Sequence, residues 1–135
     1  MKSNGEKPVP KNVEIAVRNV RSSREISNTI QKIESAGSQV IYYKADITNL
    51  EKMQQIVEKA QDQMGQITGV LHGAGVLADK HLHKKTESDY DRVYQTKIKG
   101  LDVLMKSVEI KQLKHLILFS SAAGFYGNEA QSDYA

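Results

Sequence analysis

Short apolar runs alternate with amphipathic segments along most of this chain. Each run has a length typical of a buried strand and is too short for a core helix. The four runs that we predict to be strands are Val13–Val17, Gln39–Tyr43, Ile67–Leu71 and Lys114–Phe119. Strands that alternate with amphipathic helices form βαβ units. The order therefore predicts an α/β fold with a parallel sheet that helices cover on both faces.

Helix-capping signals mark where the amphipathic segments begin and end. A hydroxyl residue and an acidic residue at capping-box spacing satisfy each other's free backbone amides. Two such pairs are present, Ser22 with Glu25 and Thr48 with Glu51, and Thr86 and Asp89 open a third helix. We predict that Gly37 and Gly65 end the first two helices. The third helix is predicted to run to about Val108.

Composition limits the function classes. The 135 residues, with Pro8 and Pro10 in a polar start, predict a disordered lead or linker over residues 1–12 and one domain over residues 13–135. No cysteine is present, which rules out disulfides and thiolate metal sites and suits a cytoplasmic protein. The net charge is only +3 and the basic residues are scattered, so we expect no nucleic-acid partner. No apolar run approaches the roughly 18 residues of a membrane span, and we expect no membrane partner.

Two hydroxyl residues follow the last predicted strand. Ser121 comes just after its carboxyl end, and Tyr134 follows 13 positions later. Ligands of α/β proteins bind at the carboxyl ends of strands, so this pair is a candidate for hydrogen bonding and proton transfer to a carbonyl oxygen. Ser121 lacks the flanking glycines of a nucleophile elbow, which argues against a serine hydrolase.

Lys97 interrupts the apolar stripe of the third helix. Tyr90, Tyr94, Leu101 and Leu104 surround it at helical spacing. A lysine at such a position either extends its stem toward solvent or is held there to place a cation. The helical pattern by itself favours the first alternative.

Further candidates lie after the earlier predicted strands. The Gly73-Ala74-Gly75 turn either lets the backbone approach a bound group or is simply a tight exit from a strand. Asp46 either accepts hydrogen bonds from a base or ribose or caps a helix. Arg18 either meets a ribose 2′-phosphate or is exposed without a partner. His81 and His83 lack the further ligands of a metal site, and no metal is predicted.

Taken together, four motifs resemble the ketoreductase domain of modular polyketide synthases, within the short-chain dehydrogenase/reductase superfamily. The resemblance covers the chain from about Val13 to its end. The motifs are Asp46-Ile47-Thr48, Gly69 to Val76, Lys97 to Gly100, and Phe119 to Gly124 with Gly127, Gln131, Tyr134 and Ala135. The fold implied is a Rossmann-like, doubly wound parallel sheet.

This resemblance implies an oxidoreductase that uses NADPH to reduce the β-keto group of an acyl chain carried by an acyl carrier protein, within a multidomain synthase. Tyr134 would be the acid, Ser121 the hydrogen-bond donor to the same oxygen and Lys97 an assisting cation. Asp46 would lie by the adenine and Arg18 by the 2′-phosphate. The other implied cofactor-binding residues are Ile47, Gly73, Ala74 and Gly75. Leu77-Ala78-Asp79 partly resembles the Leu-Asp-Asp loop of the B-type stereochemical class.

The chain also departs from the family pattern. It has no glycine-rich phosphate loop before Val13, and it ends before the asparagine that the family places four residues after the tyrosine. We therefore predict a domain truncated at both ends, lacking the first strand and the C-terminal elements. The missing strand would leave a gap between the Val13 and Ile67 strands. As an isolated chain it would bind NADPH weakly and be weakly active or inactive.

Two alternatives remain from the sequence. The chain is either such a reductase or a non-catalytic structural or docking fragment, which includes half of a split reductase that needs a partner chain. An unrelated flavodoxin-like binding domain would require all four motif matches to be coincidental.

Overall fold

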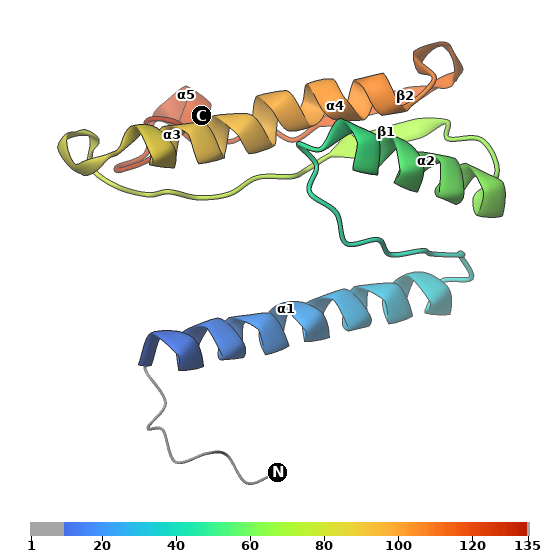
Figure 1. Ribbon diagram of the computed structural model, residues 1–135, viewed down its shortest axis with the longest axis horizontal. Helices are drawn as coiled ribbons and strands as arrows, with labels where there is room; N and C mark the ends of the chain where they lie inside the picture. The colour runs from blue at the N-terminus through green and yellow to red at the C-terminus, as the bar shows by residue number, and fades with distance from the viewer. Residues whose placement is uncertain (1–9, 135) are drawn as a thin grey trace, which may run out of the picture. The chain divides into compact units, whose positions relative to one another are not determined.

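The computed structural model describes residues 10–134, and its contacts divide the chain into two compact units, residues 1–42 and 43–135 (Figure 1). The first unit contains one long helix, α1 (Pro10–Ser35). The second contains α2 (Leu50–Met64), β1 (Gly69–His72), α3 (Glu87–Tyr94), α4 (Gly100–Ser107), β2 (His115–Leu118) and α5 (Ala123–Tyr126). None of the helices in residues 10–134 is both long enough and apolar enough to cross a membrane.

Helix α1 overturns two predictions. Val13–Val17 was expected to be a strand and is helical, and the expected capping box at Ser22 and Glu25 lies inside the same helix. A short apolar run does not distinguish a strand from a helix, and Val13, Val17 and Val20 also recur at helical spacing. Pro10 occupies the first position of α1, where a missing N–H breaks no helical hydrogen bond. Of the predicted disordered lead, residues 1–9 lie outside the described residues, whereas residues 10–12 belong to α1 and are helical. The domain boundary after residue 12 remains a prediction.

The end of α1 matches the prediction for Gly37. Gly37 has a φ of 82°, its N–H donates to the Glu34 carbonyl, and the Ser38 N–H donates to the Ile33 carbonyl. This is the Schellman arrangement, in which a glycine takes the left-handed conformation that closes a helix.

The segment Gln39–Tyr43 is not a strand, and the prediction of one there is wrong. A strand is defined by ladder hydrogen bonds to a neighbour, and no ladder partner for this segment exists among the described residues. The Val13 segment, which was predicted to be the preceding strand of the sheet, is helical. Only two of the four predicted strands are therefore present among the described residues. The predicted gap beside the Val13 strand does not arise, because that strand does not form.

The two remaining strands pair as predicted. β1 and β2 are parallel neighbours, with Gly69 opposite His115 and His72 opposite Leu118. The connection between them runs through α3, a π-helical segment η2 (Gln95–Lys99) and α4, which follow one another without a break. This is the predicted βαβ unit, and the fold is a partial α/β fold with a parallel sheet.

The capping predictions in the second unit were partly right. Thr86 and Asp89 open α3 as predicted, and the structure shows that they form a capping box there. Gly65 ends α2 as predicted, with a φ of 83°. At the start of α2, however, Asn49 is the cap, and its side chain accepts a hydrogen bond from the Lys52 N–H at 2.9 Å. The predicted Thr48–Glu51 box is wrong because the Thr48 hydroxyl donates to Asp46 instead.

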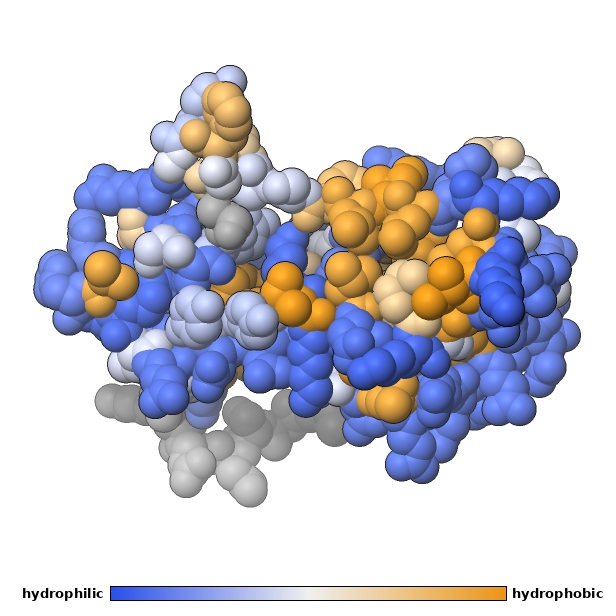
Figure 2. Space-filling view, turned by 90° about the horizontal axis from the view of Figure 1, so that it is seen from above, coloured by the Kyte–Doolittle hydropathy of each residue, from blue (hydrophilic) through white to orange (hydrophobic). Residues whose placement is uncertain are grey.

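The core of the described residues is small and lies on one face of β1. Val70 and His72 are buried, whereas Gly69 and Leu71 on the other face are exposed. The other buried apolar side chains are Val57, Ala78, Val93 and Val103. Leu116, Ile117 and Leu118 of β2 remain about half exposed, and Figure 2 shows apolar groups gathered on the side of the molecule where β1, β2 and α4 lie.

Helix α4 makes one very close approach. A Cβ added at Gly100 would lie 2.9 Å from Cγ2 of Ile47, a distance that real Cβ atoms essentially never show. The absence of a side chain at Gly100 therefore allows the loop that carries Asp46 and Ile47 to lie against the start of α4.

This contact predicts that Gly100→Ala changes the free energy of unfolding in opposite directions in two backgrounds. We expect Gly100→Ala to lower the free energy of unfolding by up to about 2 kcal/mol, because overpacking costs about 1–3 kcal/mol and better helix propensity offsets about 1 kcal/mol. In an Ile47→Ala background the same substitution should raise it by up to about 1 kcal/mol. Urea denaturation measures both values, and the same sign in both backgrounds would disprove the contact.

Candidate functional site

A cavity of about 400 Å³ brings together the three predicted catalytic residues. We call it the tyrosine cavity. Lys97 enters it from η2, Ser121 from the loop after β2, and Tyr134 from the segment after α5. The remaining lining residues are His72, Tyr90, Tyr94, Ile98, Leu101, Leu118, Phe119, Ser120, Ser132 and Asp133. A strand end, a helix and the last loop thus contribute to one cavity.

The Lys97 ammonium is held between the end of β2 and the Tyr134 ring. Its Nζ donates a hydrogen bond of 3.2 Å to the Phe119 carbonyl and lies 5.4 Å from the centroid of the tyrosine ring. The second distance lies within the range of a cation–π contact. Of the two alternatives left by the sequence, the geometry favours a placed cation over a stem that simply extends toward solvent.

The backbone at Lys97 is also held, by a residue that the sequence did not single out. His72, at the end of β1, is 4% exposed, and its Nε2–H donates to the Lys97 carbonyl at 2.9 Å. In η2 the Gly100 N–H reaches the Gln95 carbonyl, a π-type bond, and π-bulges are frequent at functional sites. The usable signal was strand alternation, which places His72 on the same buried face as Val70.

The two glycines of the turn after β1 differ in how closely other residues approach them. A Cβ at Gly75 would lie 3.1 Å from Cε of Lys97 and 3.8 Å from Cε2 of Tyr134. A Cβ at Gly73 would meet Phe119 at an ordinary van der Waals distance of 3.5 Å. Only Gly75 is therefore required by a close approach, and the groups that approach it are two of the predicted catalytic residues.

A second, open pocket of about 510 Å³ contains four of the predicted cofactor-binding residues. We call it the aspartate pocket. Asp46, Ile47, Ala74 and Gly75 line it together with Tyr43, Ala45, Met53, Ile56 and Thr96. Gly75 touches the Lys97 stem, which lines the other cavity, so the two hollows adjoin at this glycine.

Asp46 is a carboxylate with one oxygen engaged and one available. The Thr48 N–H and hydroxyl both donate to Oδ1, at 2.9 and 2.8 Å. These two bonds, the backbone one first, lower the pKa of Asp46, so the group is ionised near neutral pH. Asp46 does not cap α2, and among the described residues no hydrogen bond occupies its Oδ2.

The residues of the aspartate pocket suit one part of a nicotinamide dinucleotide. An ionised carboxylate accepts hydrogen bonds from a ribose or an adenine amino group, Ile47 offers an apolar surface, and Gly75 leaves room beside Lys97. Arg18 lies exposed on α1 in the first unit, and its predicted contact with a 2′-phosphate remains a prediction.

Comparison with known proteins shows the family. The KR domain model matches residues 10–135. One of the polyunsaturated fatty acid synthase subunits from Thraustochytrium sp. is 39% identical over 132 residues, which are 97% of this chain and 5% of that protein. Polyketide synthase PksN of Bacillus subtilis is 34% identical over 84% of this chain and 2% of its own length.

Two solved structures have the same fold. The crystal structure of an N-terminal ketoreductase from the macrolactin assembly line matches with a TM-score of 0.76 and 30% identity, over 83% of this chain and 23% of that one. A ketoreductase domain from the bacillaene assembly line matches with a TM-score of 0.74 and 31% identity, over 81% of this chain and 26% of that one. The chain thus spans about a quarter of these structures, and it belongs to the KR, or ketoreductase, domain family of polyketide synthases.

The Asp46 interactions give a testable pKa. Thr48→Val removes the hydroxyl donor and keeps the backbone donor, so we expect the Asp46 pKa to rise part of the way to its ordinary value. Because this pKa is lowered in the folded state, its stabilising effect is present above the ordinary value and is lost as the pH falls through the lowered one. Carbon-detected NMR titration of the Asp46 carboxyl group measures the shift.

Thr29→Val provides the matched control, since the Thr29 hydroxyl donates to a backbone carbonyl of α1 and not to a carboxylate. An Asp46 pKa that is equal in both variants would contradict the assigned cause.

Proposed function

We propose that this chain contributes to an NADPH-dependent ketoreductase that acts on the β-keto group of an acyl chain bound to an acyl carrier protein. The observation that carries the proposal is the tyrosine cavity, which Lys97, Ser121 and Tyr134 line together beside Gly75, where an added Cβ would press on the Lys97 stem. The similar proteins are polyketide and polyunsaturated fatty acid synthases, which supports a place within a multidomain synthase, and we propose a cytoplasmic location.

Tyr134 is proposed as the acid. Its hydroxyl gives a proton to the former carbonyl oxygen, which becomes the hydroxyl of a 3-hydroxyacyl product. Lys97, 5.4 Å from the ring centroid, places a positive charge near the ring whose oxygen becomes negative. That charge favours proton release during the reaction and assists proton return afterwards.

Ser121 is proposed as the second donor to the same oxygen. Its Oγ already accepts a hydrogen bond of 3.2 Å from the Ala123 N–H, so the direction of the oxygen is set by the turn. The hydroxyl hydrogen then remains for the substrate. A donor held in advance stabilises developing negative charge without reorganisation during the reaction.

The aspartate pocket is the proposed cofactor site. Asp46 and Ile47 would hold the adenine side, and the Gly73-Ala74-Gly75 turn would lie along the cofactor. For Arg18, in the first unit, binding of the 2′-phosphate is proposed from the family resemblance alone. When bound, NADPH supplies the hydride that the carbonyl carbon receives. Because the pocket adjoins the tyrosine cavity at Gly75, cofactor and carbonyl group would meet beside Lys97.

Substitutions in the full-length protein test these roles. We expect Tyr134→Phe to lower kcat for an acetoacetyl-pantetheine thioester by about 100- to 10,000-fold, the range of general acid catalysis. Ser121→Ala should lower it by about 100- to 1,000-fold, since a fixed donor is lost. Gly75→Ala should lower it about tenfold, because Lys97 must shift by a few tenths of an ångström. NADPH oxidation measures all three rates.

Gly69→Ala is the matched control, since Gly69 lines neither hollow and a Cβ there meets only His115 at an ordinary 3.7 Å, and its kcat should stay within about threefold of the parent. Full activity in Tyr134→Phe would contradict the proposed acid. Absence of reduction by the parent protein would favour the non-catalytic alternative.

A further inference from the structure

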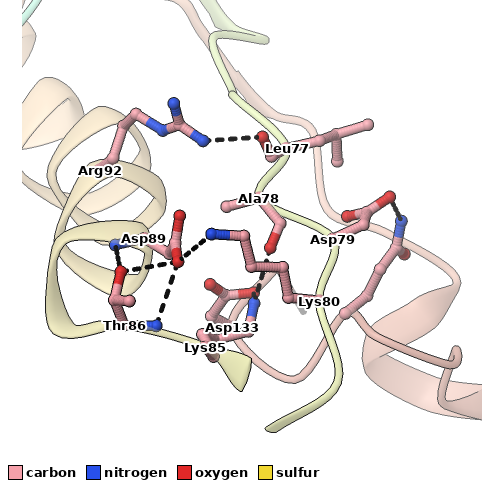
Figure 3. Close-up of polar contacts among 10 residues, drawn as sticks. Leu77, Ala78, Asp79, Lys80, Lys85, Thr86, Asp89, Arg92 and Asp133 are labelled. Atoms are coloured by element: carbon pink, nitrogen blue, oxygen red, sulfur yellow. Dashed lines mark hydrogen bonds and ion pairs between the residues drawn. The ribbon is translucent and has the colours of Figure 1, made fainter. Parts of the chain in front are cut away.

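A buried ion pair lies next to the proposed acid. Lys85 Nζ and Asp133 Oδ1 are 2.6 Å apart, and their side chains are only 5% and 2% exposed (Figure 3). The other lysine–carboxylate pairs of the described residues, Lys80–Asp89 and Lys106–Asp102, leave their lysines 46% and 60% exposed. The Lys85–Asp133 pair is thus different in kind, because both charges are removed from water.

Lys85 joins two segments that are distant in the sequence. Besides Asp133, its ammonium donates a hydrogen bond of 3.0 Å to the Ala78 carbonyl. The same two segments are linked again by the Lys80 N–H, which donates to the Ala130 carbonyl at 3.0 Å, and by Gln131 Nε2, which donates to Asp79 Oδ2 at 3.1 Å. We call Lys85, Asp133 and the Ala78 carbonyl the clamp.

The clamp holds the backbone that carries Tyr134. Asp133 immediately precedes Tyr134 in a segment without regular structure, where the Tyr134 N–H donates a 3.2 Å hydrogen bond to the Gln131 carbonyl. Asp133 also lines the tyrosine cavity. Since neighbouring side chains share the same backbone, a fixed Asp133 limits how far the Tyr134 ring can move relative to Lys97.

Stability alone is a weak reason for such a pair. Removing two charges from water costs several kcal/mol per ion, and apolar replacements of a buried pair are often neutral or stabilising. Asp133 Oδ2 is moreover buried without a hydrogen-bond partner among the described residues, which adds to the cost of the carboxylate. The pair is better explained by what it orients than by what it stabilises.

We propose that Lys85 and Asp133 are positioning residues that hold Tyr134 against Lys97 for proton transfer. The inference rests on the proposed function, because it assigns the clamp a purpose only if Tyr134 is the acid. Neither residue needs to touch the substrate. The clamp therefore changes the rate of the chemical step and leaves substrate affinity nearly unchanged.

The test uses a double variant, Lys85→Met/Asp133→Asn, in the full-length protein. It removes both charges, so no buried charge is left unpaired, as it would be in either single variant. The matched control is Lys106→Met/Asp102→Asn, which removes an exposed pair of 2.7 Å on α4.

We expect kcat of the clamp variant to fall at least about tenfold, with KM within about twofold of the parent, because misplacement slows the chemical step. The solvent deuterium isotope effect on kcat should increase, since proton transfer becomes more rate-limiting, and a purely structural role would not change it. The control should match the parent in both quantities. A parent-like kcat and isotope effect in a folded clamp variant would overturn the proposal.

Asp133→Glu keeps both charges and serves if the double variant does not fold. Its longer side chain moves the anchor point, so kcat should again fall and the isotope effect rise; parent values would overturn the proposal. Tyr134→Phe, measured in parallel, separates the two hypotheses. Full activity in Tyr134→Phe rejects the proposed acid itself, whereas its loss combined with parent-like clamp variants rejects only the positioning role.

Discussion

The close approach at Gly75 is the constraint on which the site depends. A Cβ at this position would come within 3.1 Å of the Lys97 stem and 3.8 Å of the Tyr134 ring. A side chain on the turn after β1 would therefore push the Lys97 stem of the π-helical segment away from its place beside the Tyr134 ring. Because Gly75 also lines the aspartate pocket, the same residue joins the two hollows.

Two hydrogen bonds hold Lys97 beside Gly75, one made by its side chain and one by its backbone. The Phe119 carbonyl, just past the end of β2, accepts from its ammonium, and His72 at the end of β1 donates to its backbone carbonyl. Since β1 and β2 are parallel neighbours, their carboxyl ends lie at the same edge of the sheet. The ends of the two strands thus fix the position of the Lys97 ammonium, and the helical connection between the strands carries this residue.

The sequence predicted the parts of this arrangement that depend on local signals. The start of α3 at Thr86 and the two paired strands followed from local spacing. The placing of Lys97, Ser121 and Tyr134 at one site was implied by the family resemblance and not by the spacing alone. The strands expected at Val13 and Gln39 did not form, because a short apolar run does not by itself supply a pairing partner.

Contacts between distant residues were beyond the reach of the sequence. His72 lies 25 residues from Lys97, and Lys85 lies 48 residues from Asp133. No sequence periodicity connects such pairs. In the sequence a buried lysine cannot be distinguished from an exposed one, because its burial depends on a partner that only the structure shows. The family match identified the residues proposed for chemistry, whereas the residues that hold them in place required the structure.

The most direct test traces the transferred hydride with a deuterium label. The full-length protein is incubated with an acetoacetyl-pantetheine thioester and NADPH that carries deuterium at C4 of the nicotinamide, in each of the two stereospecifically labelled forms, and the product is analysed by mass spectrometry. If the account is correct, one of the two forms yields a 3-hydroxybutyryl thioester with a single deuterium on the former carbonyl carbon. Recovery of unreduced thioester by a folded protein, with either form, would contradict it.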